Sequence, residues 1–222
     1  AVSWGSVVLL LMAQYWFLYQ MSAKMSEGKS GMLFGLISLA ITFAIGKIYA
    51  MNMTLMLRPE VWVDMYAAKP TGTGMPTGDP TTLPRYLFVM VGGLVGGGIW
   101  SALHGSMSHV PEQAAALLRK SGGLMTAIGA MLLLPLGYMV MSTQTPELRE
   151  ALAAQPLYSL SGYLVVGTTL LVALIGVAQA MGKMQKLLII QVNALLSFLG
   201  IAGMVRVRDG IRDITLKSKG FD

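Results

Sequence analysis

The chain has 222 residues but no cysteine and only two histidines. Without cysteine it cannot form a disulfide, ligate an iron–sulfur cluster through thiolates or attach a c-type haem covalently. Charge is also scarce, since 12% of the residues are charged, whereas a typical soluble domain has about a quarter. Hydrophobic residues make up 55% of the chain. The composition therefore indicates an integral membrane protein.

Acidic residues are absent from every long apolar run of the sequence. Each run is continuous rather than alternating over about ten residues, so we expect helices and not the strands of an outer-membrane barrel. A helix needs about 20 apolar residues to cross a bilayer. Because proton relays usually use acidic residues or histidines, a proton pump built from this chain alone is not expected. We predict an all-α integral membrane protein, a bundle of six transmembrane helices over residues 4–21, 32–55, 84–103, 122–141, 158–181 and 187–204.

The spans leave little sequence outside the membrane. We expect one transmembrane helical domain over residues 1–206, an extramembrane loop over residues 57–83 and a basic C-terminal tail over residues 207–222. The loop begins with a short amphipathic stretch that carries Trp62 and Tyr66. Its second half is rich in Pro, Gly and Thr, which is typical of a loop rather than a span.

Two shorter helices are predicted in the connectors between spans. Pro111 and Glu112 indicate the start of a short interfacial helix ahead of the fourth span. Thr145, Pro146 and Glu147 have the pattern of an N-cap, a first helical residue and an acidic first turn. We therefore expect a second helix to begin directly after Thr145.

The net charge of +6 suits contact with anionic lipid or with an acidic partner. Nucleic acid is not expected as a partner, because the basic residues lie in loops beside the membrane and in the tail. Six spans place both termini on one side, and the short lysine-bearing loops favour termini on the outer side, although the basic tail opposes that orientation. No basic leader with a short apolar core precedes the first span, so no signal peptide is expected.

Three ionisable residues in or beside the apolar runs are candidates for a functional role. His104 and His109 are five positions apart beside the third span. Since haem b in a membrane bundle takes its axial imidazoles from helices, interfacial histidines are the favoured interpretation over haem or metal ligands. Lys47 lies deep in the second span as a predicted buried charge. It would pair with a carboxylate of a partner subunit, bind a lipid phosphate or snorkel to the surface.

Glycine is concentrated in the third span, at five of the seven positions from Gly92 to Gly98. Gly92 with Gly96, and Gly93 with Gly97, form small-xxx-small pairs that let helix backbones approach closely. A bare face of this kind also suits a flat ring such as haem or a quinone, but helix packing is the commoner use. The sequence has no phosphate-cradling loop, no Ser–His–Asp set and no group with metal-ligand spacing. We therefore predict no catalytic residue and no metal site.

The segment AIGKIYAMNMTLMLRPEVW, followed by DPTTLPRYLFVMVGGLVGGGIWSAL, resembles subunit I of cytochrome bd-type quinol oxidases, and more closely its short bd-like relatives. In that family a helix ends with an asparagine and a Met-x-x-Pro-like element, matched here by Asn52, Met56 and Pro59. An Asp-Pro element, here Asp79–Pro80, then leads into the next helix. The resemblance covers roughly residues 9–140 and implies part of the bd subunit I helix bundle.

The resemblance implies that the first four spans correspond to the third to sixth family helices. It also implies that two earlier family helices, one with a haem-ligating histidine, are absent from this chain. Phe88 stands where the family has its low-spin haem ligand. The region that matches the family's quinol-binding loop has Glu147 and Glu150 but no lysine, whereas the family uses a lysine and a glutamate. Because Phe88 cannot ligate iron, we expect the glycine face after it to hold a neighbouring helix, a lipid or a quinone tail rather than haem. Oxygen reduction by this chain alone is not expected.

Three functions follow as hypotheses. The preferred one is an accessory membrane subunit of a multi-subunit respiratory or photosynthetic electron-transfer complex in the bacterial inner membrane. It would anchor cytochrome-bearing partner subunits and line a quinone or lipid pocket near Trp62, Tyr66 and Arg85. The first alternative is a haem b-binding, quinol-oxidising subunit with ligands from His104, His109 or a methionine. The second is a small transporter or channel with the lysine of the second span at its site.

Overall fold

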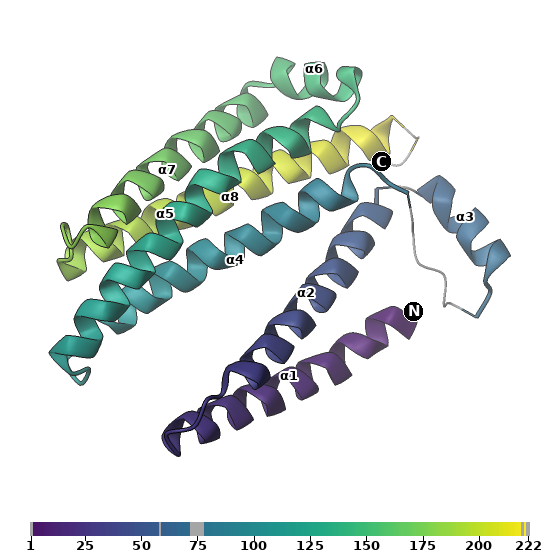
Figure 1. Ribbon diagram of the computed structural model, residues 1–222. Helices are drawn as coiled ribbons and strands as arrows, with labels where there is room; N and C mark the ends of the chain where they lie inside the picture. Colours follow the sequence, from purple (N-terminus) through teal and green to yellow (C-terminus); the bar gives the residue numbers. More distant parts are fainter. Residues whose placement is uncertain (1, 58, 72–77, 219, 221–222) are drawn as a thin grey trace. The chain divides into compact units, whose positions relative to one another are not determined.

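The computed structural model describes residues 2–57, 59–71, 78–218 and 220. Every regular element in these ranges is an α-helix (Figure 1). Six of the helices are long and apolar enough to cross a membrane, so the prediction of an all-α protein with six such helices is confirmed. The elements are α1 (Val2–Ser26), α2 (Met32–Leu55), α3 (Pro59–Ala68), α4 (Thr82–His104), α5 (Glu112–Ser142), α6 (Pro146–Ala154), α7 (Pro156–Ala180) and α8 (Leu187–Lys217).

Two of the spanning helices extend ten residues or more beyond the apolar runs within them. α5 begins at Glu112, ten residues before the predicted span, and α8 continues to Lys217, thirteen residues beyond it. The prediction of a separate interfacial helix starting at Pro111 is therefore wrong. Residues 112–121 are mostly good helix formers with no proline among them, so the helix continues into the span without a break. Hydropathy locates the membrane portion of a helix and not its end.

The chain divides into two compact units, residues 1–86 and residues 87–222. The boundary falls inside α4. From the sequence we expect one domain over residues 1–206, because nothing in the apolar run of α4 marks a division. We call the two parts unit 1 and unit 2.

Unit 1 contains a hairpin of α1 and α2, followed by α3 and the first turn of α4 (Figure 1). Gln14 Nε2 donates to Thr42 Oγ1 at 2.5 Å, and Thr42 Oγ1 donates to the Ser38 carbonyl oxygen at 3.0 Å. Trp4 and Tyr49 meet edge to face with ring centroids 4.8 Å apart. Lipid tails are as apolar as leucine, so transmembrane helices associate through polar and packing contacts of this kind.

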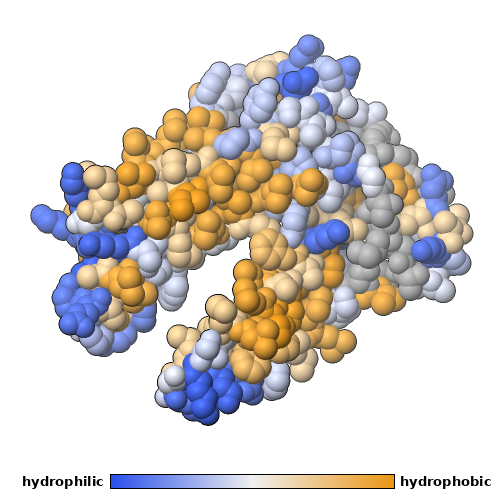
Figure 2. Space-filling view, in the orientation of Figure 1, coloured by the Kyte–Doolittle hydropathy of each residue, from blue (hydrophilic) through white to orange (hydrophobic). Residues whose placement is uncertain are grey.

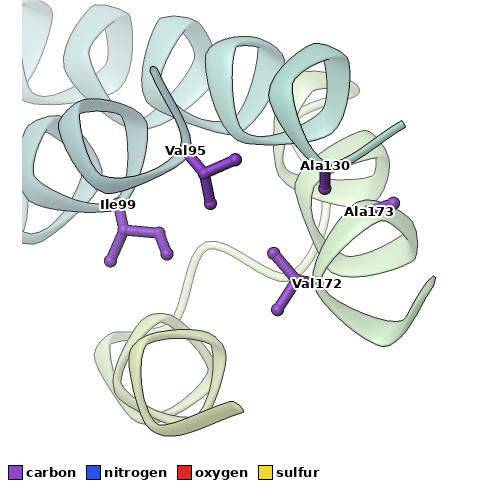
Figure 3. Packing of buried hydrophobic residues seen from close by; sticks show 5 residues of the cluster. All are labelled: Val95, Ile99, Ala130, Val172 and Ala173. Carbon is purple, nitrogen blue, oxygen red and sulfur yellow. The ribbon is translucent and has the colours of Figure 1, made fainter. Parts of the chain in front are cut away.

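Unit 2 is a bundle in which α4, α5, α7 and α8 lie side by side (Figure 1). Its core takes Val95 and Ile99 from α4, Ala130 from α5, and Val172 and Ala173 from α7 (Figure 3). Partly buried residues of α8 pack against this cluster: Ala194 and Leu196. Two of the five core residues are alanines, which indicates that these helices approach one another closely.

α4 and α5 approach until their backbones touch. A methyl group placed on Gly98 would lie 2.6 Å from the carbonyl oxygen of Gly122 and 2.7 Å from the amide nitrogen of Thr126. A methyl group placed on Gly122 would lie 2.5 Å from the carbonyl oxygen of Gly98 and 2.8 Å from the amide nitrogen of Ala102. The small-xxx-small pairs used here are therefore Gly98 with Ala102 and Gly122 with Thr126.

A neighbouring face of α5 packs against α7 in the same way. A methyl group placed on Gly123 would lie 2.7 Å from the amide nitrogen of Ala180. One placed on Gly176 would lie 2.8 Å from the amide nitrogen of Ala127. α5 thus has one small-residue face for α4 and another for α7, and it is the central helix of these contacts.

The predicted start of α6 is confirmed. Thr145 Oγ1 accepts a hydrogen bond from the Leu148 amide at 3.3 Å, and Pro146 is the first helical residue. Leu148 and Leu152 are buried, and α6 packs against α7 and α8. The cap and the two leucines together place this short helix against α7 and α8 within unit 2.

The α1–α2 turn and the α7–α8 turn each pass through a glycine with a positive φ. Gly28 follows α1 with φ 71°, and Gly182 follows α7 with φ 78°. In each turn the amide of the following lysine donates to a carbonyl five residues earlier, at 2.9 Å and 2.8 Å respectively. This is the Schellman pattern, in which a left-handed residue, usually glycine, ends a helix. Local sequence therefore suffices to specify both reversals.

Hydrophobic surface covers the flanks of the long helices, and hydrophilic residues gather at their ends (Figure 2). In the most apolar window of each span the chain buries few of its own residues, from 6% in α1 and 11% in α2 to 28% in α7. Apolar surface of this extent requires lipid or other protein to cover it. The distribution matches helices that cross a bilayer and turn at its surfaces.

Candidate functional site

Lys47 lies in the apolar middle of α2, eight residues before the last residue of that helix, Leu55. Its side chain is exposed on the surface of the chain. The predicted buried charge is therefore not covered by the described residues of the chain itself. None of those residues forms an ion pair with it. An unpaired ammonium group in hydrocarbon costs several kcal/mol, so a residue of this kind is a functional candidate.

The turn of α2 that carries Lys47 is also where the beginning of α4 is attached. The Tyr86 hydroxyl donates to the carbonyl oxygen of Phe43 at 3.1 Å. In an α-helix the amide of Lys47 donates to the same carbonyl, so the hydroxyl lies at the helical turn of the lysine. Because its proton is directed at Phe43, the tyrosine oxygen can only accept a further hydrogen bond. Of these two side chains, Lys47 alone can donate to an anion.

The residues predicted to line a quinone or lipid pocket belong to α3 and the first turn of α4. Tyr66 is exposed near the end of α3, and Arg85 is half-buried and has an interaction of its own. The side chain of Trp62 lies outside the described residues. The described contacts do not join Tyr66 to Arg85. The pocket therefore stays a prediction.

The two histidines lie together where α4 ends. His104 is the last residue of α4, and its ring meets the ring of His109 edge to face, with centroids 5.7 Å apart. This contact leaves no space for a porphyrin plane between the imidazoles, so the two rings would have to separate to act as an axial pair. A search of the described residues finds no group of three or more His, Cys, Asp or Glu that could hold a metal ion.

Arg119 connects three segments at the same end of unit 2. Its Nη1 donates to the Gly105 carbonyl at 2.7 Å, its Nη2 pairs with Glu112 at 2.6 Å, and its Nε donates to Gln185 Oε1 at 3.4 Å. Gln185 Nε2 in turn donates to the carbonyl of Gln179 at 3.1 Å. The network ties the end of α4 and the α7–α8 turn to α5. The three bonds donated by Arg119 hold these segments together.

The turn between α1 and α2 is a charged cluster outside the spans. Glu27 accepts hydrogen bonds from Lys29 at 2.9 Å and from Lys24 at 3.4 Å. These bonds, first the one from Lys29, lower the pKa of Glu27 below its ordinary value. The carboxylate therefore stays ionised, and the turn of Lys24, Glu27 and Lys29 keeps a net positive charge.

The structure divides the glycines of the predicted packing face. Gly98 contacts the backbone of α5, and a methyl group placed on Gly97 would lie 3.7 Å from Met125 Cε. The ring of Phe88, one turn before Gly92, lies against α5, where a methyl group on Gly137 would be 3.4 Å from it. The other three glycines would meet no heavy atom of the described residues within 4 Å, and we call them the open face of α4: Gly92, Gly93 and Gly96.

Two side-chain amides that the structure buries are not singled out by the sequence patterns above. Gln179 in α7 and Asn193 in α8 are each 1% exposed. The Nε2 of Gln179 and both amide atoms of Asn193 lack a hydrogen-bond partner among the described protein groups. Burial of an unpaired amide costs free energy. The available signal was an amide within an apolar run, which is the same kind of signal that marks Lys47.

Replacement of Asn193 by leucine raises the free energy of unfolding by about 1 kcal/mol. The apolar side chain of similar shape loses no protein hydrogen bond and removes the desolvation penalty of the amide. The matched control is Gln14→Leu, which breaks the 2.5 Å bond to Thr42 and lowers the same free energy by about 1 kcal/mol. Unfolding by SDS titration of the micelle-bound protein measures both. A destabilising Asn193→Leu would instead indicate that a bound group pairs with this amide.

No family model, curated protein or solved structure matches this chain. The likeness to bd-type subunits therefore rests on its sequence motifs. The structure adds the geometry of the surfaces described above: the Lys47 turn, the open face of α4 and the buried amides.

Proposed function

We propose that the chain is an integral membrane subunit of a multi-subunit respiratory or photosynthetic electron-transfer complex in the bacterial inner membrane. Its role is to anchor and position other membrane subunits rather than to catalyse a reaction alone. The observation that carries the proposal is how little of each span the chain covers itself, which is 6% of the apolar window in α1 and 11% in α2. Spans so sparsely covered leave large surfaces for partner helices.

The open face of α4 supports a role in assembly. Gly92, Gly93 and Gly96 expose helix backbone with no side chain of the described residues against it. Transmembrane helices pack closely at such small-residue faces, because short distances strengthen dispersion contacts. The neighbouring Gly98 is already used in this way by α5, so the same helix has one occupied and one unoccupied face.

The electron-transfer class is supported by the resemblance of Asn52, Met56, Pro59 and the following helix to bd-type subunits. The position that matches the family's haem ligand is Phe88, whose ring lies against α5. A bd-like scaffold without its haem ligands is suited to an accessory subunit. In this proposal the region of Trp62, Tyr66 and Arg85 lines a quinone or lipid pocket.

Purification of the native complex tests the proposal. A tag on the chain, after extraction in mild detergent, is expected to recover further membrane subunits that bear cytochromes and show redox difference spectra. An unrelated inner-membrane protein with the same tag is the control. A chain that migrates alone, without redox partners, contradicts the proposal. A b-type spectrum from the isolated chain would instead favour the haem-binding alternative with His104 and His109.

A further inference from the structure

We infer that Lys47 forms an ion pair, inside the membrane, with a carboxylate on a transmembrane helix of a partner subunit. The inference rests on the proposed function, because it assigns the chemistry of one contact in that complex. It also makes the face of α2 around Lys47 an interaction surface. The argument depends on the depth of the lysine, the direction of its side chain and the positions of the acidic residues in this chain.

Lys47 lies too deep for its ammonium group to reach the membrane surface easily. α2 has 24 residues, and at about 1.5 Å per residue the Cα of Lys47 is about 5 Å along the axis from the helix midpoint. Half of the hydrocarbon core is about 15 Å thick. The side chain spans on the order of 6 Å from ordinary bond lengths. Even fully extended along the helix, it would leave the charge in hydrocarbon.

The direction of the side chain makes the surface still harder to reach. Side chains on an α-helix lean towards its N-terminus. The nearer end of α2 is its C-terminus, at Leu55. The lysine therefore leans towards the middle of the bilayer and away from the nearer surface. A lipid phosphate, which lies outside the hydrocarbon core, is for the same reason not the occupant that the geometry favours.

The described residues of the chain do not supply a counter-charge for Lys47. None of its ten acidic residues lies in the six predicted spans. The carboxylates that follow next in sequence, Glu60 and Asp64, belong to α3 beyond the end of α2. Among the described residues none forms an ion pair with Lys47. We therefore assign the carboxylate to another chain.

A carboxylate is the partner group that this site recognises best. Tyr86 directs its only proton at Phe43, so the anion would be held by the ammonium group of Lys47. A charge within the membrane is normally paired with an opposite charge or with backbone carbonyls. In a medium of low dielectric the attraction between the two ions is strong. Loss of either partner leaves the other unpaired, so the pair specifies which helix docks on α2.

The test compares Lys47→Met with Lys47→Arg in the full chain of the native complex. Lys24→Met is the matched control, because Lys24 lies at the surface turn beside Glu27. Removal of one member of a buried ion pair is expected to reduce the partner subunits recovered per chain about tenfold or more in Lys47→Met. Lys47→Arg keeps the charge and, like the control, is expected to recover the wild-type amount.

A zero-length cross-link identifies the partner group directly. An apolar carbodiimide activates a carboxylate, which the amine of Lys47 then attacks to form an amide, while the carbodiimide takes up the water lost and becomes a urea. The wild-type complex is expected to give one peptide that joins Lys47 to an Asp or Glu of another subunit's transmembrane helix. Lys47→Arg is expected to lose this cross-link but to keep the complex.

Assembly and stability separate a lost interface from a misfolded chain. The isolated Lys47→Met chain is expected to unfold at the wild-type temperature or above, because an unpaired charge has been removed from the micelle interior. Wild-type recovery of partners by Lys47→Met, equal loss by Lys47→Arg, a less stable isolated variant or a wild-type complex without the cross-link would each overturn the inference. A wild-type chain that recovers no partner at all contradicts the proposed function itself.

Discussion

Gly98→Ala lowers the free energy of unfolding by about 2 kcal/mol or more, although alanine is the better helix former. The added methyl group would lie 2.6 Å from the carbonyl oxygen of Gly122 and 2.7 Å from the amide nitrogen of Thr126. Backbone atoms cannot rotate away as a side chain can, so α4 and α5 must move apart. The separation also loosens the core around Val95 and Ala130. SDS titration of the micelle-bound protein measures the loss.

Gly96→Ala is the matched control on the same helix. A methyl group at Gly96 would meet no heavy atom of the described residues within 4 Å, so only the helix preference of alanine remains. The free energy of unfolding is expected to stay within about 0.5 kcal/mol of the wild type or to rise slightly. An equal loss from Gly96→Ala and Gly98→Ala would contradict the division of this helix into an occupied and an open face.

Arg119→Met lowers the free energy of unfolding by about 2 kcal/mol, within the range for hydrogen bonds to charged groups. The side chain of Arg119 is 16% exposed, whereas that of its ion-pair partner Glu112 is 83% exposed. The ion pair is therefore well solvated on one side and contributes little. Most of the effect comes from the Gly105 carbonyl and the Gln185 amide oxygen, which lose their donor. Thermal unfolding in detergent measures it.

Glu112→Gln separates the ion pair from the rest of the network. It keeps an acceptor for Arg119 and removes only the negative charge, so the expected change is below about 1 kcal/mol. A loss as large as that of Arg119→Met would show that the charge pair, and not the link to Gly105 and Gln185, holds this end of unit 2 together.

The predictable parts of the fold are those set by local sequence. The span of α2 was predicted with its observed bounds, because the apolar run and the helix end together. The N-cap at Thr145 follows from three adjacent residues, and it forms as expected. The predicted helix at Pro111 is wrong, because hydropathy changes near residue 122 while helix hydrogen bonding does not. A change in solvent does not end a helix.

The contacts between helices were harder to predict than the helices. Gly92 and Gly96 have the same small-xxx-small spacing as Gly98 and Ala102, but only the second pair faces α5. Spacing shows that a close approach is possible. Which pair makes it depends on the rotation of each helix about its axis, and that rotation results from all the side chains packed around it.

For the candidate site too, the sequence predicts one part and the tertiary structure decides the rest. A lysine within an apolar run marks itself as a functional candidate, whatever the fold, because of the cost of its charge in hydrocarbon. That Lys47 is exposed, and that Tyr86 is bound to the carbonyl of Phe43 in the same turn, could not be read from sequence, because residues 43 and 86 meet only after the chain folds. Asn193, in contrast, is buried, and its amide has no hydrogen-bond partner among the described protein groups. The sequence could not predict this, because it depends on which side chains of other helices surround Asn193.

By itself, the sequence determined that this is an all-α chain with six helices suited to a membrane, and that Lys47 is the one lysine within the six predicted spans. Composition and hydropathy are sums over residues, so they can be calculated without knowledge of the fold. Only the tertiary structure decided that α5 serves both α4 and α7, and that three glycines of α4 stay open. Those outcomes depend on which helix faces meet. Which faces meet depends on the rotation of each helix about its axis, and that rotation is set by contacts between residues far apart in the sequence.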